Sequence, residues 1–136
     1  MAIALGAPVF TSNTNVSASS ITNTITIGAG DTIYIGAVVS SDDTFALSCT
    51  TYPGGGPPTI NTIGSTVTDT SGNQKYTHYY VENPGAGTYT FTWAGTPVGN
   101  TWADLFSVAI TGGDTTGFLV ANGPGQYQFN PATTTD

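Results

Sequence analysis

The amino-acid sequence predicts an all-β protein, folded as an antiparallel β-sandwich of eight to nine short strands. Apolar and polar residues alternate with a period of two through most of the chain, as in strands that bury one face. Clusters of Gly, Pro, Asn, Asp and Ser interrupt this pattern at intervals typical of sandwiches and barrels. Helical spacing of apolar residues is not sustained anywhere. Two antiparallel sheets packed face to face, immunoglobulin-like or jelly-roll-like, account for such a pattern.

The individual strands differ in how clearly they alternate. Residues 88–93 read Thr-Tyr-Thr-Phe-Thr-Trp, which predicts that Phe91 and Trp93 share a buried face. Residues 32–39 are more continuously apolar, suit the centre of a sheet and place Ile35 in the core. We expect strands near residues 3–10, 20–27, 31–39, 45–52, 58–67, 75–82, 87–93, 102–111 and 117–121.

Length and termini favour one domain. The chain has 136 residues, a common size for a single core. We expect the sandwich to span residues 1–120 and residues 121–136 to form a C-terminal extension, either an interaction arm or an edge strand in cis. The apolar N-terminus lacks a positively charged region and contains Pro8, so we expect no signal peptide and a complete chain. No run of residues is apolar enough to predict a membrane span.

Charge is scarce and mostly negative. Only 7% of residues are charged, against roughly 25% in an average domain. The formal net charge is −7, and Lys75 is the only Lys or Arg. Nucleic acids and anionic membrane surfaces are therefore not expected as partners, because both are bound through several basic side chains. Uncharged Thr, Ser, Asn and Gly must supply most of the polar surface.

Catalytic chemistry has few candidate residues. His78 lies between Tyr76 and Tyr80 in the alternating pattern, which favours a hydrogen-bonded packing role over that of a base. The acidic pair that merits inspection is Glu82 and Asp104, because paired carboxylates can hydrolyse glycosides when they face each other across a cleft. We expect no catalytic residues and a protein that is not an enzyme.

Metal, cofactor and thiol chemistry are also not expected. One His and one Cys cannot form a structural zinc site, and Asp42 and Asp43 lack the spacing of a calcium loop. The loop Pro53–Pro58 lacks the Lys and the helix of a phosphate-binding loop. Cys49 has no basic neighbour in sequence, which predicts an inert buried thiol. We expect no cofactor and no metal.

Four segments together resemble a known kind of β-sandwich module. They are Ile25–Val39, Cys49–Gly56, Thr77–Phe91 and Phe106–Gly113. Their order and turn signatures are similar to modules of tailed-bacteriophage structural proteins and of large bacterial surface proteins. The resemblance covers about two-thirds of the chain, includes no catalytic residues and ends before the segment beyond Val120. It implies a non-enzymatic role.

Two functions are compatible with this resemblance. The first is a virion structural protein, specifically a decoration (cement) protein that binds the outer capsid surface after assembly in the host cytoplasm. The second is an adhesion or carbohydrate-binding module of a cell surface. For the first, we expect the major capsid protein or another virion protein as partner, and a homo-oligomer, with a trimer favoured. The expected interaction residues are Ile3, Phe10, Trp102, Tyr127 and Phe129.

Overall fold

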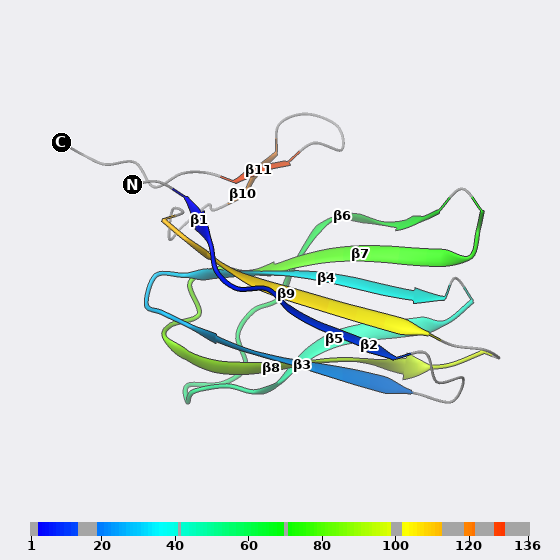
Figure 1. Ribbon diagram of the computed structural model, residues 1–136, viewed down its shortest axis with the longest axis horizontal. Coiled ribbons are helices and arrows are strands. Elements are labelled where there is room, and N and C mark those ends of the chain that lie inside the picture. Colours follow the sequence, from blue (N-terminus) through cyan, green and yellow to red (C-terminus); the bar gives the residue numbers. More distant parts are fainter. Residues whose placement is uncertain are drawn as a thin grey trace.

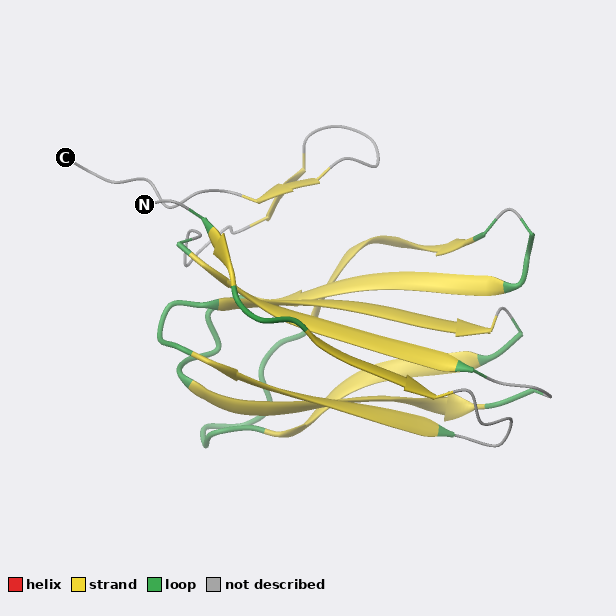
Figure 2. Ribbon diagram, in the orientation of Figure 1, coloured by secondary structure: helices red, strands yellow, loops and turns green. Residues whose placement is uncertain are grey.

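The computed structural model describes residues 3–13, 19–40, 42–69, 71–98 and 102–112, and the backbone of 119–121 and 127–129. These ranges contain eleven strands and no helix. Nine strands form two antiparallel sheets in two layers, which confirms the predicted β-sandwich (Figures 1 and 2). The strands are β1 (Ala4–Leu5), β2 (Val9–Asn13), β3 (Ser20–Ile27), β4 (Thr32–Ser40), β5 (Thr44–Thr51), β6 (Asn61–Thr68), β7 (Gln74–Val81), β8 (Gly87–Thr96), β9 (Ala103–Thr111), β10 (Leu119–Ala121) and β11 (Tyr127–Phe129).

The strands pair in a nested order. β2 pairs with β9, β3 with β8, and β4 with β7, so the chain follows the path of one long hairpin rolled into two sheets. This is the pattern of a jelly roll. The six-stranded sheet has the order β1-β9-β4-β7-β6, with β2 also on β9, and the three-stranded sheet has the order β3-β8-β5. β6 departs from the nested order because it pairs with β7 and leaves β5 at a sheet edge.

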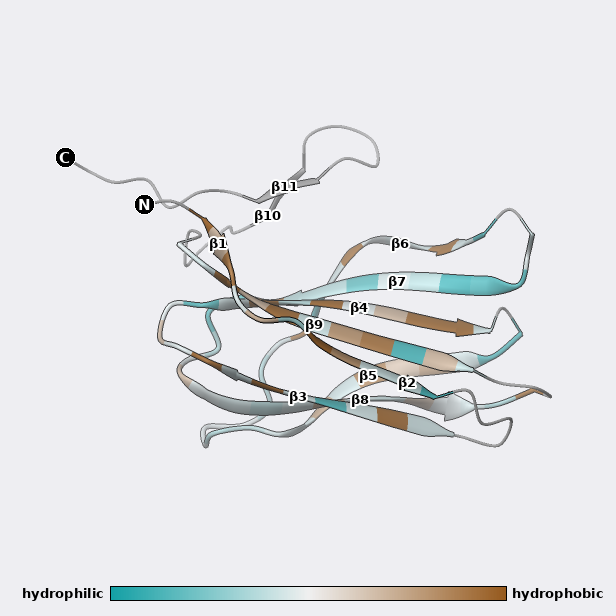
Figure 3. Ribbon diagram, viewed as in Figure 1, coloured by the Kyte–Doolittle hydropathy of each residue, from teal (hydrophilic) through white to brown (hydrophobic). Residues whose placement is uncertain are grey.

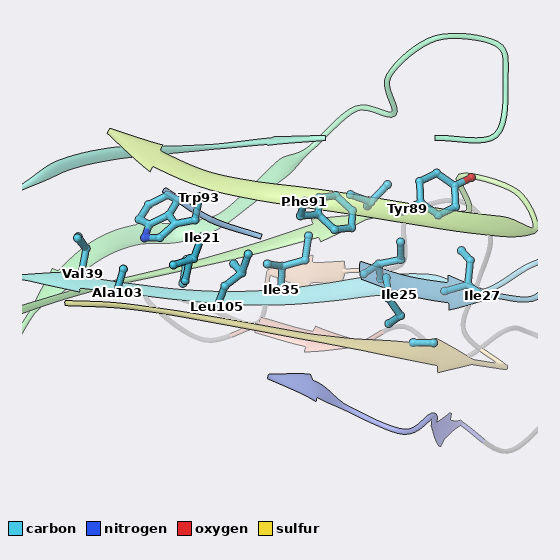
Figure 4. Close-up of a cluster of buried hydrophobic side chains, with 14 residues drawn as sticks. Ile21, Ile25, Ile27, Ile35, Val39, Tyr89, Phe91, Trp93, Ala103 and Leu105 are labelled. Atoms are coloured by element: carbon cyan, nitrogen blue, oxygen red, sulfur yellow. The ribbon is translucent and has the colours of Figure 1, made fainter. Parts of the chain in front are cut away.

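The core lies between the two sheets (Figure 4). Phe91 and Ile35 are both 0% exposed and Trp93 is buried, as the alternation predicts. Inward-facing isoleucines on β3 pack against them. Figure 3 shows hydrophobic residues along both β4 and β9, which therefore supply apolar side chains to the core and also to the opposite face of their sheet.

A buried polar cluster joins the two sheets. Asn23 on β3 is 2% exposed and shares the inward face with its neighbouring isoleucines. Its Nδ2 donates to the backbone oxygens of Val9 (3.0 Å) and Leu105 (3.2 Å). Its Oδ1 accepts a 2.5 Å hydrogen bond from the Ser107 hydroxyl. One side chain thus ties the three-stranded sheet to both β2 and β9.

Two predicted strands differ from the structure. The strand expected at residues 3–10 is divided into β1 and β2. Gly6 N still donates to Ala109 O, but Pro8 has no N–H to donate, so the hydrogen bonding to β9 is interrupted there. Of the strand expected at 117–121, the structure describes residues 119–121, which form β10 and join neither sheet of the sandwich. It pairs with β11 in a separate two-stranded antiparallel sheet.

Candidate interaction surface

The face of the six-stranded sheet that points away from the three-stranded sheet, here called the outer face, is rich in apolar and aromatic residues. Registers between paired strands place them in rows, because directly opposed residues point to the same side of a sheet. Phe106, Gly36 and His78 form one row, and Val108, Tyr34 and Tyr80 form the next. The only Lys or Arg of the chain, Lys75, opposes buried Val39 and so points inward. The outer face therefore carries no Lys or Arg.

Tyr34 lies at the centre of an aromatic cluster on the outer face. Its hydroxyl and His78 Nδ1 are 2.6 Å apart, and the two rings stack with a centroid distance of 6.0 Å. Phe106 meets the Tyr34 ring edge-on at 6.2 Å. Burial raises the pKa of the Tyr34 phenol, so it remains protonated at neutral pH. These contacts give His78 the hydrogen-bonded packing role that its position between tyrosines predicts.

The N-terminal strands extend this surface to the sheet edge. Leu5 opposes Ile110 and Phe10 opposes Phe106, so both side chains lie on the outer face. Leu5 is 70% exposed and Phe10 is 63% exposed, and Ile3 just before β1 is also exposed. We call Ile3, Leu5 and Phe10 the N-terminal edge.

An apolar cavity of about 310 Å³ adjoins this edge. Leu5 forms one side of it, and the other sides come from β4 and β9. Exposed Leu5 thus adjoins a concave apolar surface in which Val108 and Ile110 are themselves 6% and 1% exposed. The cavity is lined by Leu5, Tyr34, Phe106, Val108 and Ile110.

Of the five expected interaction residues, Ile3 and Phe10 lie along the same edge of the six-stranded sheet, about six residues of β9, or about 20 Å, apart. Trp102 is half-buried, and it exchanges hydrogen bonds with Ser40, its N donating to Ser40 Oγ and its O accepting from Ser40 N. It precedes the start of β9, about 13 Å along that strand from the position opposite Phe10 and about 26 Å from the position opposite Leu5. Trp102 is therefore only partly accessible to a partner. Tyr127 and Phe129 lie on β11, whose side chains are outside the described residues.

The carboxylates considered for catalysis are far apart. Asp104 opposes Val38, and Glu82 follows Val81, which opposes Ile33, so β4 separates the two acids by about six residues, or about 20 Å. A shared substrate bond cannot be held between them at that distance. The pair therefore does not form the glycosidase geometry for which it was considered.

The structure also places the residues considered for metal binding and for thiol chemistry. Asp43 is 1% exposed, and its Oδ1 accepts a 2.5 Å hydrogen bond from Val98 N. No group of three or more potential ligands capable of holding a metal occurs among the described residues. Cys49 is half-buried where full burial was expected, because it lies on edge strand β5, and desolvation raises the pKa of its thiol.

Sequence reasoning missed Leu5 and the aromatic cluster around Tyr34. A signal was present in residues 105–110, Leu-Phe-Ser-Val-Ala-Ile, which are apolar on both faces of one strand. In a two-layered sandwich only one face of a strand reaches the core. Phe106, Val108 and Ile110 must then pack on the other face, beside whatever the N-terminal strand supplies.

Comparisons with known proteins identify no relative of this chain. The chain matches no family model, and searches of curated proteins and of solved structures find no significant match. Within the described ranges no helix is long and apolar enough to cross a membrane.

Proposed function

We propose that this protein is a non-enzymatic virion protein that decorates the outer surface of a phage capsid. It binds the shell through the N-terminal edge and the adjoining outer face, and it forms a cyclic homo-oligomer, a trimer, on that shell. The major capsid protein is the partner. The resemblance of the sequence to phage structural modules and the jelly-roll pairing of the strands, which is common among capsid and lectin domains, both fit this role.

The observation that carries the proposal is the exposure of the N-terminal edge. Leu5 and Phe10 are 70% and 63% exposed while their register partners Ile110 and Phe106 lie in the sheet beside them. A few well-packed side chains near the centre of a contact surface supply most of its binding energy once water is excluded. Many weak copies bound to one shell gain further affinity from multivalency.

Electrostatics support an outward location on the particle. With a formal net charge of −7 and one basic side chain, the chain would be repelled by packaged DNA inside a capsid. On the outside no such repulsion arises. Because the chain has few charges, long-range electrostatic attraction to a partner is weak. Apolar contacts made by the N-terminal edge supply the affinity instead.

A catalytic role receives no support from the described residues. His78 is bonded to Tyr34, and Glu82 and Asp104 lie at opposite ends of β4. We expect no hydrolase or transferase turnover by the purified protein. Turnover that is abolished by His78→Ala or by Glu82→Gln would contradict the proposal.

Thermal stability of the shell is the test of the decorating role. Empty capsid shells of the virus that encodes the chain should lose their integrity at a higher temperature after the protein is added, as followed by light scattering. Size-exclusion chromatography with light scattering should report a trimer, and deletion of residues 122–136 should weaken trimer formation or shell binding while the sandwich stays folded. An unchanged shell transition, with no bound protein, would refute the role.

A further inference from the structure

The sandwich is open on one side, between β5 and β6. Both are edge strands, because β6 pairs with β7 and not with β5. On the opposite side, the inward residues Ile21 and Ile25 of β3 are 5% and 4% exposed. The inward residues of β5 are only half-buried. The gap in the jelly-roll pairing thus leaves space between the sheets on the β5 side.

A cavity of about 340 Å³ occupies this open side. Its volume is within the lower part of the range for small-molecule sites, roughly 300–1,000 Å³. Aromatic side chains form part of its wall: Phe45 and Tyr79 both contact Trp93, with ring centroids 5.8 and 6.2 Å away. Phe45 and Tyr79 are half-buried, so their rings are partly free to contact a ligand.

Polar groups converge on the same cavity. Lys75 points inward from β7, and its Nζ donates to Asp43 O at 3.3 Å, which leaves further N–H groups of the ammonium for another partner. Asp43 is 1% exposed, and its Oδ2 is buried without a hydrogen-bond partner. Thr66 and Thr77 contribute hydroxyls 2.9 Å apart. The only Lys or Arg of the chain is thus half-buried and lines this cavity.

The charges select the chemistry of the ligand. An anion would be repelled by the Asp43 carboxylate, which is buried in the cavity wall, and a cation would be repelled by the Lys75 ammonium, so a neutral molecule suits the pair best. Burial raises the pKa of the Tyr79 phenol, which therefore stays neutral. The ligand should carry several donors and acceptors together with an apolar C–H face for the aromatic wall. A sugar ring combines these properties.

We propose that this cavity binds one neutral monosaccharide, either free or as the terminal unit of a glycan. The site lies between the sheets, away from the N-terminal edge, and does not depend on the proposed shell binding. Lys75 and the threonine hydroxyls hydrogen-bond the sugar hydroxyls, and Tyr79 and Phe45 contact the ring.

Titration with defined sugars tests the site. The neutral probes are the methyl glycosides of glucose, galactose and mannose, and the charged comparators are glucuronate and glucosamine, with backbone amide NMR as the readout. At least one neutral probe should bind saturably, and about tenfold more tightly than either comparator. Stronger binding to an immobilised glycan that ends in the same sugar would identify a glycan as the ligand, whereas equal binding would identify the free sugar.

Matched variants locate the binding. Lys75→Met keeps the length of the side chain without its charge, and Thr66→Val removes one hydroxyl from an exposed residue. Each should weaken sugar binding about tenfold, with folding checked by the urea midpoint. Trp102→Phe, outside the cavity, should leave binding unchanged. Absence of saturable binding by all three neutral probes, equal binding of a charged comparator, or binding insensitive to both cavity variants would overturn the proposal.

Discussion

Removing the Asn23 side chain should destabilise the protein more than any single exposed substitution on the same strand. Asn23→Ala deletes three hydrogen bonds that join β3 to β2 and β9. A hydrogen bond contributes about 0.5–1.5 kcal/mol net, and a buried acceptor left without a donor adds a desolvation cost. Asn23 and Ser107 are 2% and 0% exposed, so water does not replace the lost partner easily. We expect a loss of about 3–4 kcal/mol in the free energy of unfolding.

Urea unfolding followed by tryptophan fluorescence measures this loss. Thr24→Ala is the matched control, because Thr24 is the next residue on β3 and its exposed hydroxyl bonds only to that of Thr90. It should cost less than about 0.5 kcal/mol. A double-mutant cycle with Ser107→Ala should give a coupling energy of about 1 kcal/mol. If Asn23→Ala costs no more than Thr24→Ala, the sheets are not held together through this side chain.

Three further predictions concern the core, a close backbone approach and the thiol. Phe91→Ala and Ile35→Ala, both at positions 0% exposed, should each cost about 2–5 kcal/mol in urea unfolding, and nearly neutral effects would contradict the strand phases. Gly95→Ala should lower the free energy of unfolding by about 1–3 kcal/mol or more, because the added Cβ would lie 1.8 Å from Thr44 O. Gly36→Ala should be tolerated, because the nearest atom to its added Cβ is 3.9 Å away. Equal melting temperatures for the two variants would refute this prediction. Burial raises the pKa of the Cys49 thiol, so its thiolate fraction at neutral pH is below that of a free cysteine. The rate of its reaction with a disulfide reagent should therefore rise at a higher pH than the rate for glutathione. Coincident pH curves for the two thiols would contradict the burial.

Local pattern was sufficient to predict most strands but not their partners. β3 occupies residues 20–27 as expected, and Phe91 and Trp93 are buried, because alternation over several residues identifies both a strand and its inner face. The pairing of β6 with β7, which leaves β5 at an edge, depends on contacts between distant segments. No property of either strand alone determines it.

The functional surfaces depend on the same long-range register. Ile3 and Phe10 were expected to contact a partner because an end segment can add a strand to a neighbouring sheet edge, and the structure places them at an edge of the chain's own six-stranded sheet. Leu5 and Tyr34 belong to that surface only because β1 and β4 both pair with β9. The alternation along β3 places Asn23 on the same inward face as the core isoleucines. Its hydrogen-bond partner Ser107, however, is 84 residues away in the sequence. Pro8, in contrast, was a visible local reason to divide the first strand.

Co-sedimentation with empty capsid shells tests the proposed shell-binding edge most directly. The wild-type protein should pellet with shells of the virus that encodes it. The double variant Leu5→Asp and Phe10→Asp, which places two charges on the exposed apolar edge, should lose at least tenfold in affinity. Thr22→Asp, which places the same charge at an exposed position on the three-stranded sheet, should bind as the wild type does. Failure of the wild type to pellet, or undiminished binding by the double variant, would contradict the proposed function.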